Sequence, residues 1–257
     1  MLAEILFSVI IILSYFMEYR MTKHRNCIRT IILFIFLLFV IVPVFAQDSH
    51  CLAGKKVIVF VAWRNFSDDQ FKIVNEYLTN AGAEVIITSS SKGTAIGMKD
   101  LKLDIKKPLK RYKPKSDIDG IILIGGHGMW ADYWDNADLQ KWCIAMNETG
   151  KLIAAIGTAP GVLSGAGILI GKKATIWDLY TVRLHQGSAR VINQHVVADG
   201  NIITADKTIA SKLFIKEVIR YWSPNAFQHN TSGASDSSVS PFQKGTRIDS
   251  KPIQLQQ

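Results

Sequence analysis

The sequence predicts a doubly wound α/β domain, in which helices cover both faces of a mainly parallel β-sheet. Its β-branched apolar runs are continuous rather than alternating, as expected for strands that are buried on both faces. These runs alternate along the chain with segments whose apolar residues recur at helical spacing. The length of 257 residues and the apolar content of 48% suit one medium-sized globular domain with additional segments.

The first strand–helix unit occupies residues 56–81. Residues 56–62, KVIVFVA, form a buried strand, and a helix runs from Ser67 to Ala81, where Gly82 ends it. The apolar face of that helix consists of Phe71, Val74, Leu78 and Ala81. We expect residues 85–88 to form the second strand of the sheet.

Two further units surround a polar, lysine-rich segment at residues 89–116. We expect a short strand within this segment near residues 101–105. Residues 119–125, DGIILIG, form a buried strand, and a helix covers residues 136–149. The apolar residues of that helix lie at positions i, i+3, i+4 and i+7, and they are Leu139, Trp142, Cys143 and Met146.

The last part of the domain completes the sheet. Residues 152–156 form a strand, and Pro160 stands in the first turn of the next helix, where a missing N–H costs nothing. A further strand is expected at residues 174–177. Residues 196–204 form a hairpin around an Asp-Gly turn, and an amphipathic helix covers residues 210–222.

Residues 1–46 are interpreted as an export signal. An unbroken apolar run at residues 31–42 follows several basic residues, and Val44-Phe45-Ala46 has the small-residue pattern of a signal-peptidase site. The natural start would then be Met21. The alternative is a membrane anchor made of the apolar segments at residues 5–16 and 31–46, although both are short for a spanning helix.

These assignments divide the chain into four parts. After the signal, residues 47–54 form a linker and residues 55–222 form a single domain. Residues 223–257 form a polar tail with too little apolar surface to pack, and we expect this tail to be disordered. The expected location is exported, periplasmic or otherwise extracytoplasmic, with membrane contact only through an uncleaved N-terminal segment.

The charge pattern argues against nucleic-acid binding. The formal net charge is +9, and the densest basic stretch runs from Lys99 to Lys115. This stretch lacks the interleaved aromatic side chains of a surface that binds single-stranded nucleic acid, so we interpret it as a solvated face.

The cysteines and histidines indicate neither a metal centre nor a cofactor. Cys51 and Cys143 follow the signal, and Cys143 lies on a helical apolar stripe, which is typical of a buried hydrophobic residue. There is no CxxC motif, and His127, His185 and His195 lack the spacing of metal ligands.

Three loops should meet at the carboxyl edge of the sheet, where open α/β sheets bind ligands. They are residues 63–70, 125–134 and 157–160. The aromatic residues that could line the mouth of such a cleft are Trp63, Trp130, Tyr133 and Trp134. The meeting of three loops at one sheet edge is stronger evidence for a site than the glycine pair Gly125-Gly126 alone.

Residues 55–222 resemble the ThiJ/PfpI family of the class I glutamine-amidotransferase-like superfamily. The resemblance is carried, in order, by KKVIVFVA, NFSDDQF, AGAEV, DGIILIGGHG, KLIAAIGTAPGVLSGAGILIGKKATIW and VVADGNIITA. It implies a flavodoxin-like fold, a homodimer and a cysteine at a strand-to-helix turn, commonly hydrogen-bonded to a glutamate. Activities attributed to members include peptidase or amidase activity, glyoxalase or deglycase activity, and chaperone-like or stress-sensing roles.

The chain departs from the family pattern at the reactive positions. The family turn reads A-I-C-H-G-P or A-I-C-x-A-P, whereas residues 155–160 read A-I-G-T-A-P. The cysteine position is Gly157, the position where some members carry histidine is Thr158, and the glutamate position falls on Gln70. Glycine offers no nucleophile, and an amide does not transfer protons near neutral pH. The resemblance therefore implies a divergent member without thiol chemistry.

Each remaining polar candidate also has a purely structural interpretation. Gln70 lies three residues after Ser67, which is the spacing of a capping box at a helix start. Thr158 suits a local hydrogen bond, and Asp69 suits the dipole of the helix that begins beside it. His127 follows a glycine pair either as a base that orients a ligand or as a solvent-facing turn residue.

We expect the domain to bind a small anionic or carbonyl-containing molecule, or a partner. Backbone N–H groups at Gly126 and Thr158 could hold an anion without any cysteine. The candidate ligand-binding residues are Gln70, Gly125, Gly126, His127, Gly157 and Thr158. The alternatives are an active hydrolase or carbonyl-processing enzyme that uses His127, Thr158 or Asp69, and a membrane-tethered assembly protein.

Overall fold

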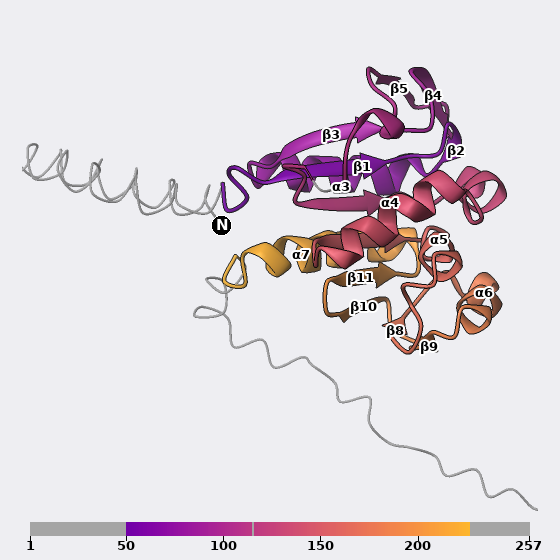
Figure 1. The fold of residues 1–257 in the computed structure, drawn as a ribbon. Helices are drawn as coiled ribbons and strands as arrows, with labels where there is room; N and C mark the ends of the chain where they lie inside the picture. The colour runs from indigo at the N-terminus through magenta and orange to yellow at the C-terminus, as the bar shows by residue number, and fades with distance from the viewer. Residues whose placement is uncertain (1–49, 115, 227–257) are drawn as a thin grey trace, which may run out of the picture.

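The computed structural model describes residues 50–114 and 116–226, and it contains the predicted doubly wound sheet (Figure 1). Six strands form this sheet in the order β10-β11-β7-β6-β1-β3, and only β10 runs antiparallel to its neighbour. The strands are β1 (Lys56–Phe60), β3 (Glu84–Thr88), β6 (Gly120–Leu123), β7 (Leu152–Ile156), β10 (Val196–Asp199) and β11 (Ile202–Ala205). The expected signal and residues 227–257 of the expected tail lie outside the described residues.

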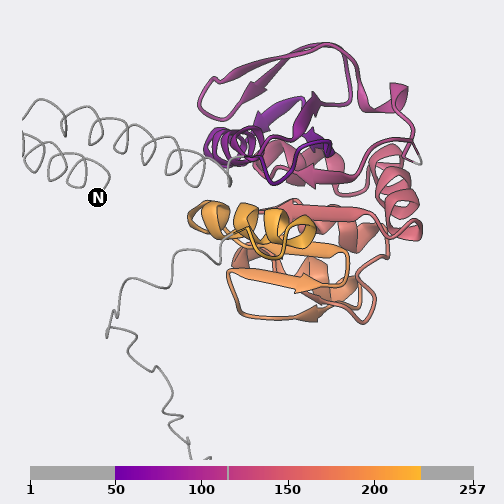
Figure 2. The same cartoon turned by 90° about the vertical axis from the view of Figure 1, so that its left-hand side faces the viewer.

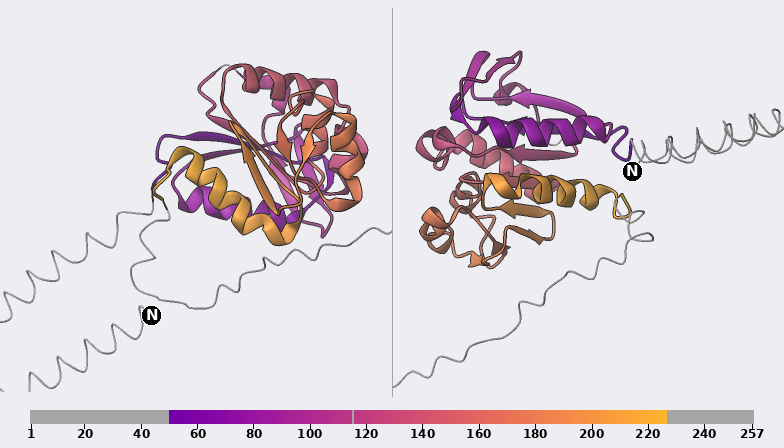
Figure 3. Two further views of the ribbon diagram at one scale, coloured as in Figure 1. Left: turned by 90° about the horizontal axis from the view of Figure 1, so that it is seen from below. Right: turned by 180° about the vertical axis from the view of Figure 1, so that it is seen from behind.

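Helices cover the two faces of the sheet. On one face, α3 (Asp68–Asn80) packs against α7 (Ser211–Trp222), and the two helices lie side by side in Figures 2 and 3. On the other face, α4 (Ala137–Glu148) packs against β6, β7 and α5 (Pro160–Gly165), and α5 contacts α6 (Thr181–Gln186). The arrangement is flavodoxin-like.

The core lies where the apolar runs predicted it. Every residue of β6 and β7 is buried, because helices cover both faces of these central strands. The helical stripes are also confirmed. The buried residues of α4 are Leu139, Trp142, Cys143 and Met146, and the apolar residues buried on α3 are Phe71, Val74 and Leu78.

Two small sheets lie outside the main one. The first consists of β2 (Arg64–Phe66), β4 (Gly93–Gly97) and β5 (Lys102–Ile105), of which only the last was predicted. The second pairs β8 (Lys173–Ala174) with β9 (Arg190–Val191).

The prediction that residues 174–177 form a strand of the main sheet is wrong, because only Lys173 and Ala174 are in a strand and that strand pairs with β9. β8 ends at Ala174, and the next two backbone bonds lead away from any ladder. The N–H of Thr175 donates to the Thr204 hydroxyl at 2.9 Å, and the N–H of Trp177 donates to the carbonyl of Gly157 at 3.1 Å. These bonds carry the segment across the carboxyl edge of the sheet.

The chain before β1 is packed against the domain. Leu52 is fully buried, and its N–H donates to the carbonyl of Ala81 at 2.8 Å. The described part of the expected linker therefore contributes to the core. No helix within residues 50–114 and 116–226 is both long and apolar enough to span a bilayer.

Candidate functional site

The turn between β7 and α5 places Gly157 in the left-handed region, with φ of +72°. Its N–H donates to the carbonyl of Ala205 at 2.9 Å, which extends the β7–β11 ladder by one bond, and its carbonyl accepts from Trp177. A residue with a side chain would cost roughly 1–2 kcal/mol in this conformation, and glycine avoids the cost. This turn, which we call the elbow, therefore favours glycine at residue 157.

The Gln70 amide fills the space beside that turn. Gln70 is buried, its Oε1 accepts from the N–H of Gly125 at 3.0 Å, and its Nε2 donates to the Thr208 hydroxyl at 3.2 Å. A Cβ built on Gly157 would lie 2.8 Å from Gln70 Nε2. No room is left at the turn for a side chain without movement of this amide.

The capping box expected from Ser67 and Gln70 does not form. Ser67 is the N-cap residue of α3, but its side chain makes no capping hydrogen bond. Gln70 instead satisfies the buried N–H of Gly125, which would otherwise lose a hydrogen bond on folding. The hydrogen bond to Gly125, which follows β6, therefore takes the place of the capping bond that the spacing of Ser67 and Gln70 predicted.

Thr158 is a local hydrogen-bonding residue in this structure. Its buried hydroxyl donates to the carbonyl of Gly126 at 2.9 Å and accepts from the N–H of the same residue at 3.1 Å. One of the two amide groups expected to hold an anion is thus already bonded. The N–H of Thr158 itself has no acceptor within the described residues.

Asp69 lies away from these contacts and faces the β4–β5 turn. Its carboxylate pairs with Lys99 Nζ at 2.7 Å near the surface. The neighbouring Asp68 is buried and accepts from the backbone N–H groups of Lys99 and Leu101, both at 2.9 Å. The two acidic residues fasten the small sheet to the start of α3.

His127 is exposed and is the first member of a chain of ring contacts that we call the aromatic rim. Its ring contacts Trp130 at 5.0 Å between centroids. The rim continues from Trp130 to Trp134 and Tyr180, and from Tyr180 to Trp177. A surface hollow of about 740 Å³ lies beside the rim and is lined by residues 130–132 and 134–137.

Tyr133 belongs to the core rather than to the rim. It is buried, its hydroxyl accepts from the N–H of Trp63 at 3.2 Å, and the same oxygen lies 2.7 Å from Ser90 Oγ. Of the four aromatic residues expected at a cleft mouth, Trp130 is exposed, whereas Trp63 and Trp134 are half-buried.

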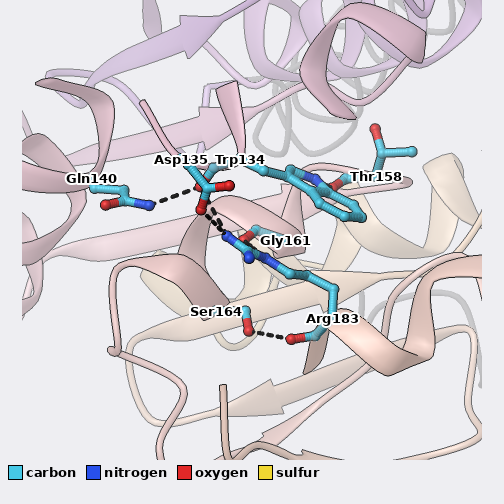
Figure 4. A network of polar contacts seen from close by, with 7 residues as sticks. All are labelled: Trp134, Asp135, Gln140, Thr158, Gly161, Ser164 and Arg183. Carbon is cyan, nitrogen blue, oxygen red and sulfur yellow. Dashed lines mark hydrogen bonds and ion pairs between the residues drawn. The ribbon is translucent and has the colours of Figure 1, made fainter. Parts of the chain in front are cut away.

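Arg183 anchors the rim to the first turn of α5 (Figure 4). Its guanidinium donates to the carbonyls of Gly161 and Trp134, both at 3.2 Å, and pairs with Asp135. It also lies over the Trp134 ring, 5.3 Å from the centroid. The Trp134 indole N–H donates in turn to the carbonyl of Thr158 at 2.7 Å. The rim and the elbow are thereby one connected structure.

Neither described cysteine offers a thiol at the elbow. Cys143 is fully buried in the middle of α4. Burial raises the pKa of the Cys143 thiol to about 12, because it disfavours the thiolate. Cys51 precedes β1 and therefore lies near the amino ends of the parallel strands, whereas Gly157 lies at their carboxyl ends.

A histidine–aspartate pair lies at the same carboxyl edge. His195 Nδ1 is 2.9 Å from Asp206 Oδ2, and Asp206 directly follows β11. No sequence motif indicated this pair, but the register of the β10–β11 hairpin could have predicted it. The Asp199-Gly200 turn pairs Val196 with Ala205, so the next residues outward face each other.

Comparisons with known proteins agree with this architecture. The family model described as DJ-1/PfpI family matches residues 55–221. An uncharacterised protein of Methanocaldococcus jannaschii is 31% identical over 176 residues, which cover 68% of this chain and 85% of that protein. A protein named a deglycase, from Pyrococcus horikoshii, is 24% identical over 152 residues, which cover 58% of this chain and 88% of that protein.

A solved structure shows the same fold. The ThiJ/PfpI domain protein of Brachyspira murdochii superposes with a TM-score of 0.62 at 23% identity, over 65% of this chain and 95% of that one. The family match covers more than half of the sequence and coincides with the domain that contains the sheet, the elbow and the rim. This chain therefore belongs to the DJ-1/PfpI family.

Proposed function

We propose that this chain is an exported DJ-1/PfpI domain that binds a small anionic or carbonyl-containing molecule, or a partner, and performs no thiol chemistry. The observation that carries the proposal is the elbow. Gly157 has no side chain to react, and the Gln70 amide stands 2.8 Å from where its Cβ would be. Relatives that are named deglycases favour carbonyl compounds as the ligand class.

Ligand contact is expected at the rim rather than deep in the elbow. Gln70, Thr158 and Gly157 are buried, and the two polar side chains among them are already hydrogen-bonded. His127 and Trp130 are exposed, and the rim to which they belong is bonded to the elbow through the Trp134 indole N–H and the Thr158 carbonyl. An anionic ligand at this rim would meet an imidazole N–H and an indole surface.

Turnover and binding test the proposal together. Full-length protein is incubated with methylglyoxal and with a peptide amide, and no turnover above the buffer rate is expected. Titration with pyruvate, an anionic carbonyl compound, should quench tryptophan fluorescence, and His127→Ala should weaken that binding. Turnover that is lost in His127→Ala would replace the proposal with a carbonyl-processing or hydrolytic enzyme.

Export and dimer formation are parts of the same proposal. N-terminal sequencing of the protein recovered outside the cytoplasm should begin at Gln47. Sedimentation of the mature protein should give twice the chain mass. Recovery of an intact N-terminus in the membrane fraction would instead support the tethered assembly protein.

A further inference from the structure

His195 and Asp206 form a pair that combines a buried carboxylate with an exposed imidazole ring, and the proposed ligand site does not include either residue. Asp206 is nine-tenths buried, and its Oδ1 is a buried oxygen with no hydrogen-bond partner in the described part of the chain. Its Oδ2 holds His195 Nδ1 at 2.9 Å. The His195 side chain is 60% exposed, whereas that of Asp206 is 12% exposed.

This geometry is the one that general-base histidines need. A buried carboxylate on Nδ1 fixes the tautomer and the orientation of the ring, and it faces the imidazolium that forms when the other nitrogen takes a proton. Nε2 is then left toward solvent, where a water molecule can reach it. A clip that only fastened β10 to β11 would add little here, because the N–H of Asp206 already donates to the carbonyl of His195 at 3.1 Å.

The pair lies at the same sheet edge as the elbow, and the backbone of Trp177 is bonded to the elbow glycine. The N–H of Gly157 donates to the carbonyl of Ala205, the residue before Asp206, and the carbonyl of Gly157 accepts from Trp177. Asp206 and Trp177 therefore flank the same glycine. Trp177 is 39% exposed and offers an apolar surface at this edge.

We propose that His195 is a catalytic general base, that Asp206 is its positioning residue, and that the pair hydrolyses small esters whose apolar group lies on Trp177. A water oxygen bonds to the acyl carbon while its proton passes to His195 Nε2. The tetrahedral intermediate then breaks the bond to the alcohol oxygen, which takes the proton from Nε2. The products are a carboxylic acid and an alcohol. This activity does not depend on ligand binding at the His127 rim.

Ester hydrolysis by the full-length protein tests the assignment, with p-nitrophenyl acetate as the probe. We expect the wild-type rate to exceed that of free imidazole at equal concentration by at least about tenfold, and His195→Gln to remove this excess. His185→Gln is the matched control, because His185 is also exposed but has no carboxylate partner among the described residues. It should leave the rate unchanged.

The separate effects on kcat and KM distinguish positioning from a structural role. Asp206→Asn should lower kcat by at least about tenfold with KM nearly unchanged, and the variant should keep the folded signal in circular dichroism. His195→Gln changes an exposed side chain, so it provides the decisive comparison even if Asp206→Asn does not fold. A wild-type rate equal to that of free imidazole, or equal losses in His195→Gln and His185→Gln, would overturn the proposal.

Discussion

At the elbow, the Gln70 amide occupies the space where a side chain of residue 157 would lie. Gly157 adopts a left-handed conformation that other residues avoid, and the Gln70 amide fills the space that a side chain would take. The same amide satisfies the buried N–H of Gly125. The space beside Gly157 is therefore filled by the hydrogen-bonded amide of Gln70, and no cavity is left at the turn.

Gly157→Ala should destabilise the domain by roughly 1–3 kcal/mol, because it adds both backbone strain and a contact with Gln70. Gly150→Ala is the matched control. Gly150 also has a positive φ, of +66°, but a Cβ there would meet nothing within 4 Å. Denaturant unfolding should show a larger loss for Gly157→Ala. Equal losses would mean that Gln70 moves aside without cost.

Gln70→Leu should cost roughly 1–3 kcal/mol, because it leaves the buried N–H of Gly125 without an acceptor. Gln70→Glu should cost less near neutral pH, since a carboxylate can still accept from that N–H and from the Thr208 hydroxyl. Thermal unfolding of the two variants at pH 7 compares them directly. A glutamate variant that is less stable than the leucine variant would contradict this account.

Among the elements, α5 is short and depends on its neighbours for position. It contains six residues, too few to be stable alone, and α4, α6 and the rim surround it. Arg183 on α6 connects three of these parts through the carbonyls of Gly161 and Trp134 and the ring of Trp134 (Figure 4). The elbow is therefore held from outside the sheet as well as by its own strand.

Arg183→Ala should lower the free energy of unfolding by roughly 2 kcal/mol and change the fluorescence of Trp134, because it removes charge-assisted bonds and a cation over the ring. Arg183→Lys should recover only part of the loss, since an ammonium cannot reproduce the planar fork. Arg190→Ala is the control, as its side chain makes no hydrogen bond within the described residues. Similar effects of both alanine variants would refute the anchoring role.

Local patterns predicted some elements and missed others for identifiable reasons. The strands of the main sheet and the stripes on α3 and α4 were predicted because burial on a fixed face imposes a period on the sequence. β2 and β4 carry no such run, and their pairing joins segments far apart in the chain. The segment at residues 174–177 has the composition of a strand, but its bonds to Thr204 and Gly157 draw it out of the sheet.

The candidate site shows the same division. The carboxyl edge followed from the order of strands and helices, and the elbow glycine followed from the family resemblance. The contacts of Gln70 could not be predicted, because its partners Gly125 and Thr208 come from other elements. The pairing of His195 with Asp206 lay within reach, since it needs only the register of one hairpin.

For the whole molecule, the ionisation of the buried Cys143 thiol is coupled to global unfolding. It lies in the shared core between α4 and the sheet, and its pKa is raised from 9.0 to about 12 by burial. The folded state therefore keeps the thiol proton at a pH where the unfolded chain has lost it. Stability is present below pH 9.0 and falls as the pH rises through the interval up to about 12.

This linkage has a definite size that one pair of proteins can measure. Between pH 8 and pH 10 the wild type should lose about 1.4 kcal/mol more of its unfolding free energy than Cys143→Ala, which has no thiol at this position and shares every other titrating group. Denaturant unfolding at the two pH values gives this difference. Any pH-independent difference in stability between the two proteins cancels, because each protein is compared with itself. Iodoacetamide should also modify Cys143 only at the rate of global opening. Parallel pH dependence of the two proteins, or rapid alkylation of the native state, would show that α4 does not seal the core as the structure indicates.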